Sequence, residues 1–127
     1  MIREFLAVGI GGAAGSMARH ALSGLVAAGC LAGGFPVGTF AVNAAGSLLI
    51  GAVTGYASQQ ALVPLLAGVG FCGGFTTFST FSADTVRLLR GGEYGTAAFY
   101  VALSLVVCTA CTAPGLWTGQ ILKNSIK

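Results

Sequence analysis

The chain has 127 residues, of which 55% are hydrophobic and only 7% are charged. Soluble domains carry about 25% charged residues, so this composition excludes a water-soluble globular domain and indicates an integral membrane protein. The net charge of +3 is small and its basic residues are scattered, which argues against a protein that binds nucleic acid.

Four hydrophobic segments are long enough to cross a membrane, since a transmembrane helix needs about 20 apolar residues. We therefore expect one all-α transmembrane domain over residues 1–127, multi-pass in the inner membrane of the cell. Gly11-x-x-x-Gly15 and Gly51-x-x-x-Gly55 have the spacing that lets two helix backbones approach closely. The expected helices cover about residues 4–28, 37–59, 62–90 and 96–122.

The third segment is too long for one straight span. A continuous helix over residues 62–90 would be about 43 Å long, against a hydrocarbon core of about 30 Å. The pair Gly73-Gly74 is expected to break it near residues 73–76, and Thr76 or Thr77 could cap a helix that restarts beyond. Inside a membrane, broken backbone persists only where protein or a water-filled path covers it, so this stretch should line a functional site.

The distribution of Lys and Arg does not select one orientation in the membrane, because both sides carry similar numbers. A chain that inserts both ways can pair with an inverted copy of itself, so we expect an antiparallel, dual-topology homodimer. One side bears Arg3, Lys123 and Lys127, and the other bears Arg87 and Arg90, with Arg19 if its side chain reaches that surface.

Several polar and aromatic residues lie within the segments. Phe78 and Phe81 share one helical face, either as a packing stripe or as ring edges that can face an anion. Asn43 could form an interhelical hydrogen bond or donate within an anion pathway. Arg19 could extend to the membrane surface or attract anions towards a vestibule.

A polar stripe follows the fourth segment at four-residue spacing, through Tyr100, Ser104, Cys108 and Thr112. Its hydroxyls could bond carbonyls of the preceding turn or serve an anion as successive donors. Cys108-x-x-Cys111 has the spacing of a redox or metal pair, but no His or carboxylate lies nearby, so two small buried residues are expected. No catalytic constellation occurs, so an enzyme is not expected.

Three motifs together resemble the Fluc/CrcB fluoride channel family over essentially the whole chain. They are Gly12-x-x-Gly15-x-x-x-Arg19, Gly38-Thr-x-x-Val-Asn43-x-x-Gly46 and Gly73-Gly-Phe-Thr-Thr-Phe-Ser-Thr-Phe81. The resemblance implies an antiparallel, dual-topology homodimer with two fluoride pores. It also implies passive fluoride efflux that lowers cytoplasmic fluoride.

The resemblance also implies roles for single residues. Gly73 and Thr76 match the positions whose carbonyls, from both subunits, hold a structural Na⁺ at the dimer interface. Cys108 departs from the polar track of the fourth helix, where a hydroxyl would be the better donor. The implied fluoride pathway contains Asn43, Phe78, Phe81, Ser79, Thr80, Tyr100, Ser104 and Thr112, with Arg19 at a vestibule.

Two other classes of protein stay open. A small multidrug-resistance-type proton antiporter also has four helices and dual topology, but it needs a carboxylate within the membrane, and Glu4 is too near the terminus to serve well. An assembly subunit without transport of its own is the other alternative.

Overall fold

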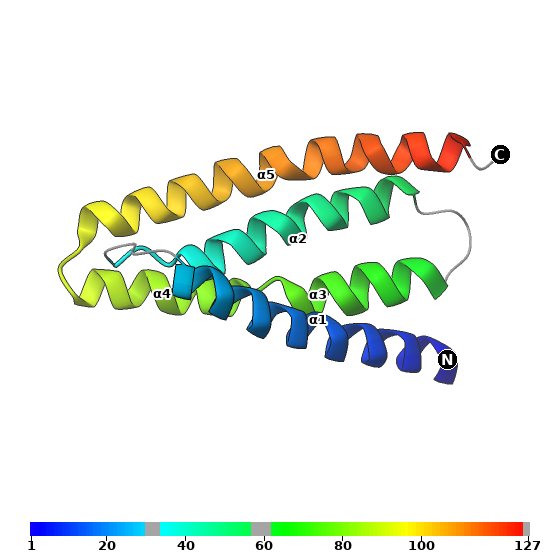
Figure 1. Ribbon diagram of the computed structural model, residues 1–127, viewed down its shortest axis with the longest axis horizontal. Coiled ribbons are helices and arrows are strands. Elements are labelled where there is room, and N and C mark those ends of the chain that lie inside the picture. The colour runs from blue at the N-terminus through cyan, green and yellow to red at the C-terminus, as the bar shows by residue number, and fades with distance from the viewer. Residues whose placement is uncertain (30–33, 57–61, 126–127) are drawn as a thin grey trace.

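The computed structural model describes residues 1–29, 34–56 and 62–125, and within these every regular element is helical. Figure 1 shows an elongated bundle in which the start of α1 and the end of α5 lie at the same end. The expected end of the second helix at residues 57–59, together with Cys30 and Lys127, lies outside the described residues. The elements are α1 (Ile2–Gly29), α2 (Val37–Tyr56), the π-helix η1 (Pro64–Cys72), α3 (Gly73–Phe75), α4 (Phe78–Arg90) and α5 (Tyr94–Ser125).

These elements form four long helical segments, because η1, α3 and α4 follow one another along a single line (Figure 1). Within the described part of the chain, three segments are long and apolar enough to cross a membrane: Val37–Tyr56, Pro64–Arg90 and Tyr94–Ser125. The α1 helix has 28 residues, which is long enough to cross a membrane, but it carries Arg19 and His20 and is not apolar enough to qualify as a span. Three of the four expected spans are therefore supported by length and composition.

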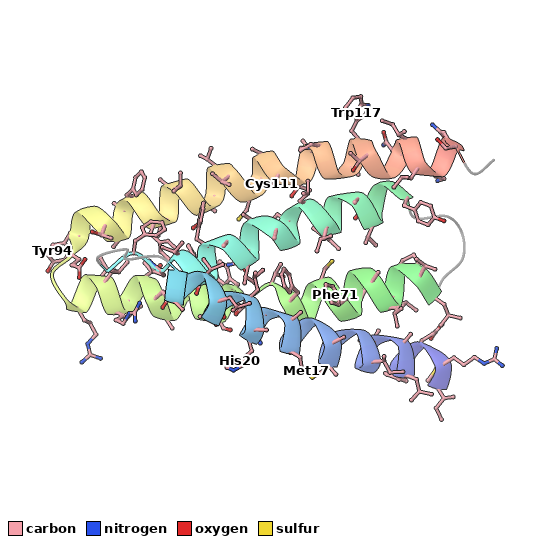
Figure 2. All side chains as sticks on the ribbon, viewed as in Figure 1. Met17, His20, Phe71, Tyr94, Cys111 and Trp117 are labelled. Atoms are coloured by element: carbon pink, nitrogen blue, oxygen red, sulfur yellow. The ribbon has the colours of Figure 1, made fainter. Side chains whose placement is uncertain are left out.

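Large apolar side chains cover the outside of the bundle, as a lipid-facing surface requires. Trp117 of α5 and Met17 of α1 are 66% and 68% exposed, and Figure 2 shows them projecting from opposite sides of the bundle. The helices thus leave their bulky residues outside and meet through small ones.

Helices α2 and α5 meet backbone to backbone through glycine. A Cβ atom at Gly51 would overlap the Thr112 carbonyl oxygen, and one at Gly55 would overlap the Leu116 carbonyl oxygen. Gly115 of α5 faces the α2 backbone in the same way. The helix contact predicted from Gly51-x-x-x-Gly55 is therefore confirmed.

Helix α1 packs against η1 and α3 by the same means. A Cβ atom at Gly11 would overlap the Leu66 carbonyl oxygen, and one at Gly74 would overlap the Gly12 carbonyl oxygen. A Cβ atom at Gly15 would also overlap a carbonyl of η1. The contact predicted from Gly11-x-x-x-Gly15 is confirmed, and it brings the third segment against the first.

The third segment leaves helical geometry at two residues. Thr76 has φ −80° and ψ 158°, and Thr77 has φ −151° and ψ 113°, so both are extended, and α4 begins at Phe78. The expectation that Gly73-Gly74 supplies the break is wrong, because both glycines belong to α3. Gly74 is needed for its close approach to α1, and the extended residues come just after that contact.

Candidate ion pathway

A cavity of about 430 Å³ lies over α2, between the third segment and α5. It exists because η1 and α3, though not α4, diverge from α5: no Cα atom of η1 or α3 lies within 8 Å of a Cα atom of α5 in the described chain. The wall residues are Asn43, Ser47, Ile50, Gly68, Val69, Cys72, Gly73, Thr76, Thr77, Phe78, Phe81, Ser104, Leu105, Cys108 and Thr109.

Asn43 of α2 holds the extended backbone of the third segment. Its Nδ2 donates to the Thr77 carbonyl oxygen at 3.1 Å, and the Thr77 N–H donates to its Oδ1 at 2.8 Å. The interhelical hydrogen bond expected as one role for Asn43 is therefore present. The amide also lies on the cavity wall and has a second N–H, for which the described residues supply no partner.

Thr77 caps α4, as one of the two predicted capping residues. The Thr80 N–H donates to the Thr77 hydroxyl oxygen at 3.1 Å, and the Thr77 hydroxyl lies 3.0 Å from the Thr80 hydroxyl. The Ser79 hydroxyl lies 3.1 Å from the same Thr77 oxygen. Ser79 and Thr80 are exposed and do not line the cavity, so in this chain their hydroxyls gather around the cap.

Phe78 and Phe81 both line the cavity, with ring centroids 5.5 Å apart. Phe81 is anchored, because its ring lies 5.1 Å from the ring of Tyr100, which is fully buried with Leu88 and Ala97. Phe78 is 77% exposed. One ring is thus fixed to the bundle while the other projects from it.

The polar stripe of α5 divides along its length. Ser104 and Cys108 line the cavity, and the Ser104 hydroxyl, in a residue that is only 7% exposed, has no hydrogen-bond partner among the described residues. Tyr100 lies deeper, against Phe81. Thr112 donates its hydroxyl to the Cys108 carbonyl oxygen at 3.0 Å and lies at the contact with Gly51, outside the cavity wall.

Gly73 and Thr76 also lie on the cavity wall. The Thr77 N–H donates to Asn43 and not to the carbonyl four residues earlier, so the Gly73 carbonyl lacks its helical partner. The Thr76 hydroxyl donates to the Cys72 carbonyl oxygen at 2.8 Å. A free carbonyl oxygen suits a hard cation such as Na⁺ better than it suits an anion.

Arg19 does not belong to this site within one chain. It lies on α1, and the described cavity wall contains no residue of that helix. Its role at a vestibule stays a prediction.

Comparison with known proteins places the chain in a family. The family model described as "CrcB-like protein, Camphor Resistance (CrcB)" matches residues 6–116. The chain belongs to this CrcB-like family. With its apolar helices, it is a multi-pass membrane protein.

Curated relatives match nearly the full length of the chain. The Geobacter metallireducens protein named "Fluoride-specific ion channel FluC" is 46% identical over 92% of this chain and 97% of its own length. The Paracoccus denitrificans protein of the same name is 44% identical over 94% of this chain and 97% of its own length. "Fluoride-specific ion channel FluC 2" of Bacillus subtilis is 44% identical over 94% of this chain and 89% of its own length.

Sequence reasoning missed two interactions, one within the site and one outside its wall. Thr77 was considered only as a cap, although its backbone is also the partner of Asn43. The Thr39 hydroxyl donates to the Asp84 carboxylate at 2.8 Å, and this bond joins α2 to α4. Arg87, on α4 like Asp84, lies 3.3 Å from the same carboxylate. The spacing of Asp84 and Arg87, three apart on one helix, was the available signal for the ion pair.

Proposed function

We propose that this protein is a fluoride-specific channel of the inner membrane that carries fluoride passively out of the cytoplasm and lowers cytoplasmic fluoride. The observation that carries the proposal is near full-length similarity to proteins named as fluoride-specific ion channels, at 46% and 44% identity. The protein is a channel and not an enzyme.

The cavity has the chemistry that this function needs. Fluoride holds its water tightly, so a pathway must replace that water with other donors. The wall offers the second N–H of Asn43 and the hydroxyl of Ser104, which has no partner within the described part of the chain. The rings of Phe78 and Phe81 add edges with positive potential.

The pathway is completed by a second, inverted copy of the chain. In one chain the cavity opens outward and Phe78 projects from the bundle, 77% exposed. An antiparallel, dual-topology homodimer covers this face and forms two pores, with the two phenylalanines of each pore coming from opposite subunits. The balanced distribution of Lys and Arg supports insertion in both orientations.

The interruption at Thr76 and Thr77 meets its copy at the dimer axis and holds a structural Na⁺ there. The Gly73 carbonyl, which lacks its helical partner and lies on the same wall as Thr76, supports this assignment. Oxygen ligands are those that a hard cation prefers.

The antiporter alternative gains no support from the site. Proton coupling needs a carboxylate within the membrane pathway, and none of the three acids of the chain, Glu4, Asp84 and Glu93, is on the described cavity wall.

The proposal is tested with liposomes that contain only the purified protein. Fluoride efflux, followed with a fluoride electrode, is expected, while chloride efflux under the same gradient is expected to stay at the level of protein-free liposomes. Absence of fluoride efflux, or equal efflux of both anions, would overturn the proposal.

A further inference from the structure

Two cysteine side chains face the same cavity from opposite walls. Cys72 of η1 is 3% exposed, Cys108 of α5 is partly buried, and both thiols are free. Cys111 is also free and lies three residues further along α5, but it does not line the cavity. Of the three described cysteines, Cys72 and Cys108 therefore line the cavity and Cys111 does not.

A disulfide does not explain this pair. The Cα atoms of two disulfide-bonded cysteines lie within about 7 Å of each other. The Cα atoms of Cys72 and Cys108 are more than 8 Å apart, since no Cα atom of η1 comes that close to one of α5. The space between them belongs to the cavity, so another group can occupy it.

The other polar side chains near the two thiols indicate which kind of ion the cavity would bind. Ser104 lies one turn before Cys108 on the same face of α5, is 7% exposed and has no hydrogen-bond partner among the described residues. No carboxylate lines the described wall. Soft thiol ligands select soft cations, whereas hard cations require carboxylate or carbonyl oxygen. The Gly73 carbonyl on this wall is the oxygen that we assign to Na⁺, and the thiols of Cys72 and Cys108 favour a soft cation instead.

We propose that Cys108, with Cys72 across the cavity, forms a binding site for soft, thiol-seeking cations such as Hg²⁺, and that the bound cation closes the ion pathway. Each thiol that binds forms an S–Hg bond and releases its proton to the solution, with no change of oxidation state. The binding site follows from the cavity alone, whereas closure of the pathway rests on the proposed fluoride channel function.

The structural reason for closure is the position of Cys108. It shares its wall with Ser104, and the facing wall carries Phe78 and Phe81. A cation fixed there occupies the cavity where we place the fluoride donors, and it removes the space through which the ion would pass.

The first measurement is fluoride efflux from proteoliposomes with and without micromolar mercuric nitrate, in a Cys30→Ser background. We expect Hg²⁺ to stop efflux by the protein that retains Cys72, Cys108 and Cys111. Loss of even an outer ligand weakens metal binding by about 10–100-fold, so Cys108→Ser should require at least about tenfold more Hg²⁺. The matched control Cys111→Ser should keep both its efflux and its sensitivity.

The second measurement does not depend on transport. At substoichiometric Hg²⁺, Cys108 should be protected from alkylation by N-ethylmaleimide, read by mass spectrometry, before Cys111 is protected. Equal protection of Cys108 and Cys111, or no protection of Cys108, would overturn the binding site. If protection is found but the protein carries no fluoride even without Hg²⁺, the proposed function fails and the cation site stands.

Discussion

Asn43 illustrates how one side chain can hold a backbone that has left its helix. The Thr77 N–H has no carbonyl of its own helix to bond, and the Asn43 Oδ1 accepts it at 2.8 Å. Within a membrane a backbone N–H that has left its helix needs another acceptor, and the Asn43 amide supplies one, which fixes the interruption in place. The same amide lies on the cavity wall, where its remaining N–H can meet an anion.

Asn43→Ala is expected to lower both stability and fluoride efflux. An unsatisfied buried N–H costs about 1–3 kcal/mol, so the thermal unfolding temperature in detergent should fall clearly. Ser47→Ala is the matched control, because Ser47 lines the cavity but only donates its hydroxyl to a carbonyl of its own helix. Equal unfolding temperatures for Asn43→Ala and the unaltered protein would contradict the role of this bond.

Phe78 and Phe81 should differ in how much they contribute to the stability of the bundle. Phe78→Ile and Phe81→Ile are both expected to reduce fluoride efflux sharply while dimers still form. Phe81→Ile should lower stability more than Phe78→Ile, by about 1 kcal/mol, because Phe81 packs against both Phe78 and Tyr100 whereas Phe78, among the described aromatic rings, packs only against Phe81. Efflux and thermal unfolding measured on the same preparations test this, and normal efflux in both variants would remove the rings from the pathway.

At the scale of the elements, glycines decide which helices meet. The α2–α5 and α1–η1 contacts place backbone against backbone, and the close approach leaves no space for a side chain. Because η1 and α5 lack such a contact with each other, they diverge and leave the cavity above α2. Tight packing on two sides therefore produces the open space between them.

Gly55→Ala is expected to destabilise the protein by forcing α2 and α5 apart, since the new methyl group would overlap the Leu116 carbonyl oxygen. Overpacking of this kind costs about 1–3 kcal/mol. Gly24→Ala is the matched control, because a Cβ atom at Gly24 of α1 would have nothing within 4 Å. That variant should keep or raise stability, since Ala favours a helix by up to about 1 kcal/mol over Gly.

At the scale of the whole molecule, one chain does not enclose its own pathway. The cavity opens to the outside, and its most exposed aromatic wall residue, Phe78, is 77% exposed. An inverted second copy would cover it, and charge balance is the property that allows both orientations. Fluoride efflux should therefore depend on the balance of Lys and Arg between the two ends of the bundle, because this balance sets the orientation of each copy.

Charge-biased variants test this dependence. Replacing Arg87 and Arg90 together by Gln should favour one orientation, and replacing Arg3 and Lys123 together should favour the other. Each variant alone should lose fluoride efflux from cells, whereas co-expression of the two should restore it. Full efflux by either variant alone would contradict the inverted pairing.

Removal of Na⁺ tests the proposed structural cation at the same scale. Protein prepared in Na⁺-free buffer should lose fluoride efflux, because the Gly73 carbonyls would be left without a partner at the dimer axis. Efflux should return on dialysis into Na⁺. Efflux that does not depend on Na⁺ at any stage would contradict the site.

The sequence by itself determined the class of protein, the helical segments and the pairs of glycines through which helices meet. These follow from composition and spacing within one stretch of chain, and three motifs together, the longest of them around Phe78 and Phe81, indicated the family. The cap of α4 was narrowed to Thr76 or Thr77, since a cap depends on residues three apart, and the structure selects Thr77.

Only the tertiary structure decided where the third segment leaves its helix and which polar residues reach the cavity. The glycines 73 and 74 were the expected break, yet they stay helical, and the extended residues are Thr76 and Thr77, held by Asn43. Ser104 and Thr112 share one stripe, but only Ser104 lines the cavity. A backbone amide bonds whichever acceptor a neighbouring helix brings to it, and that choice depends on packing between segments far apart in the chain.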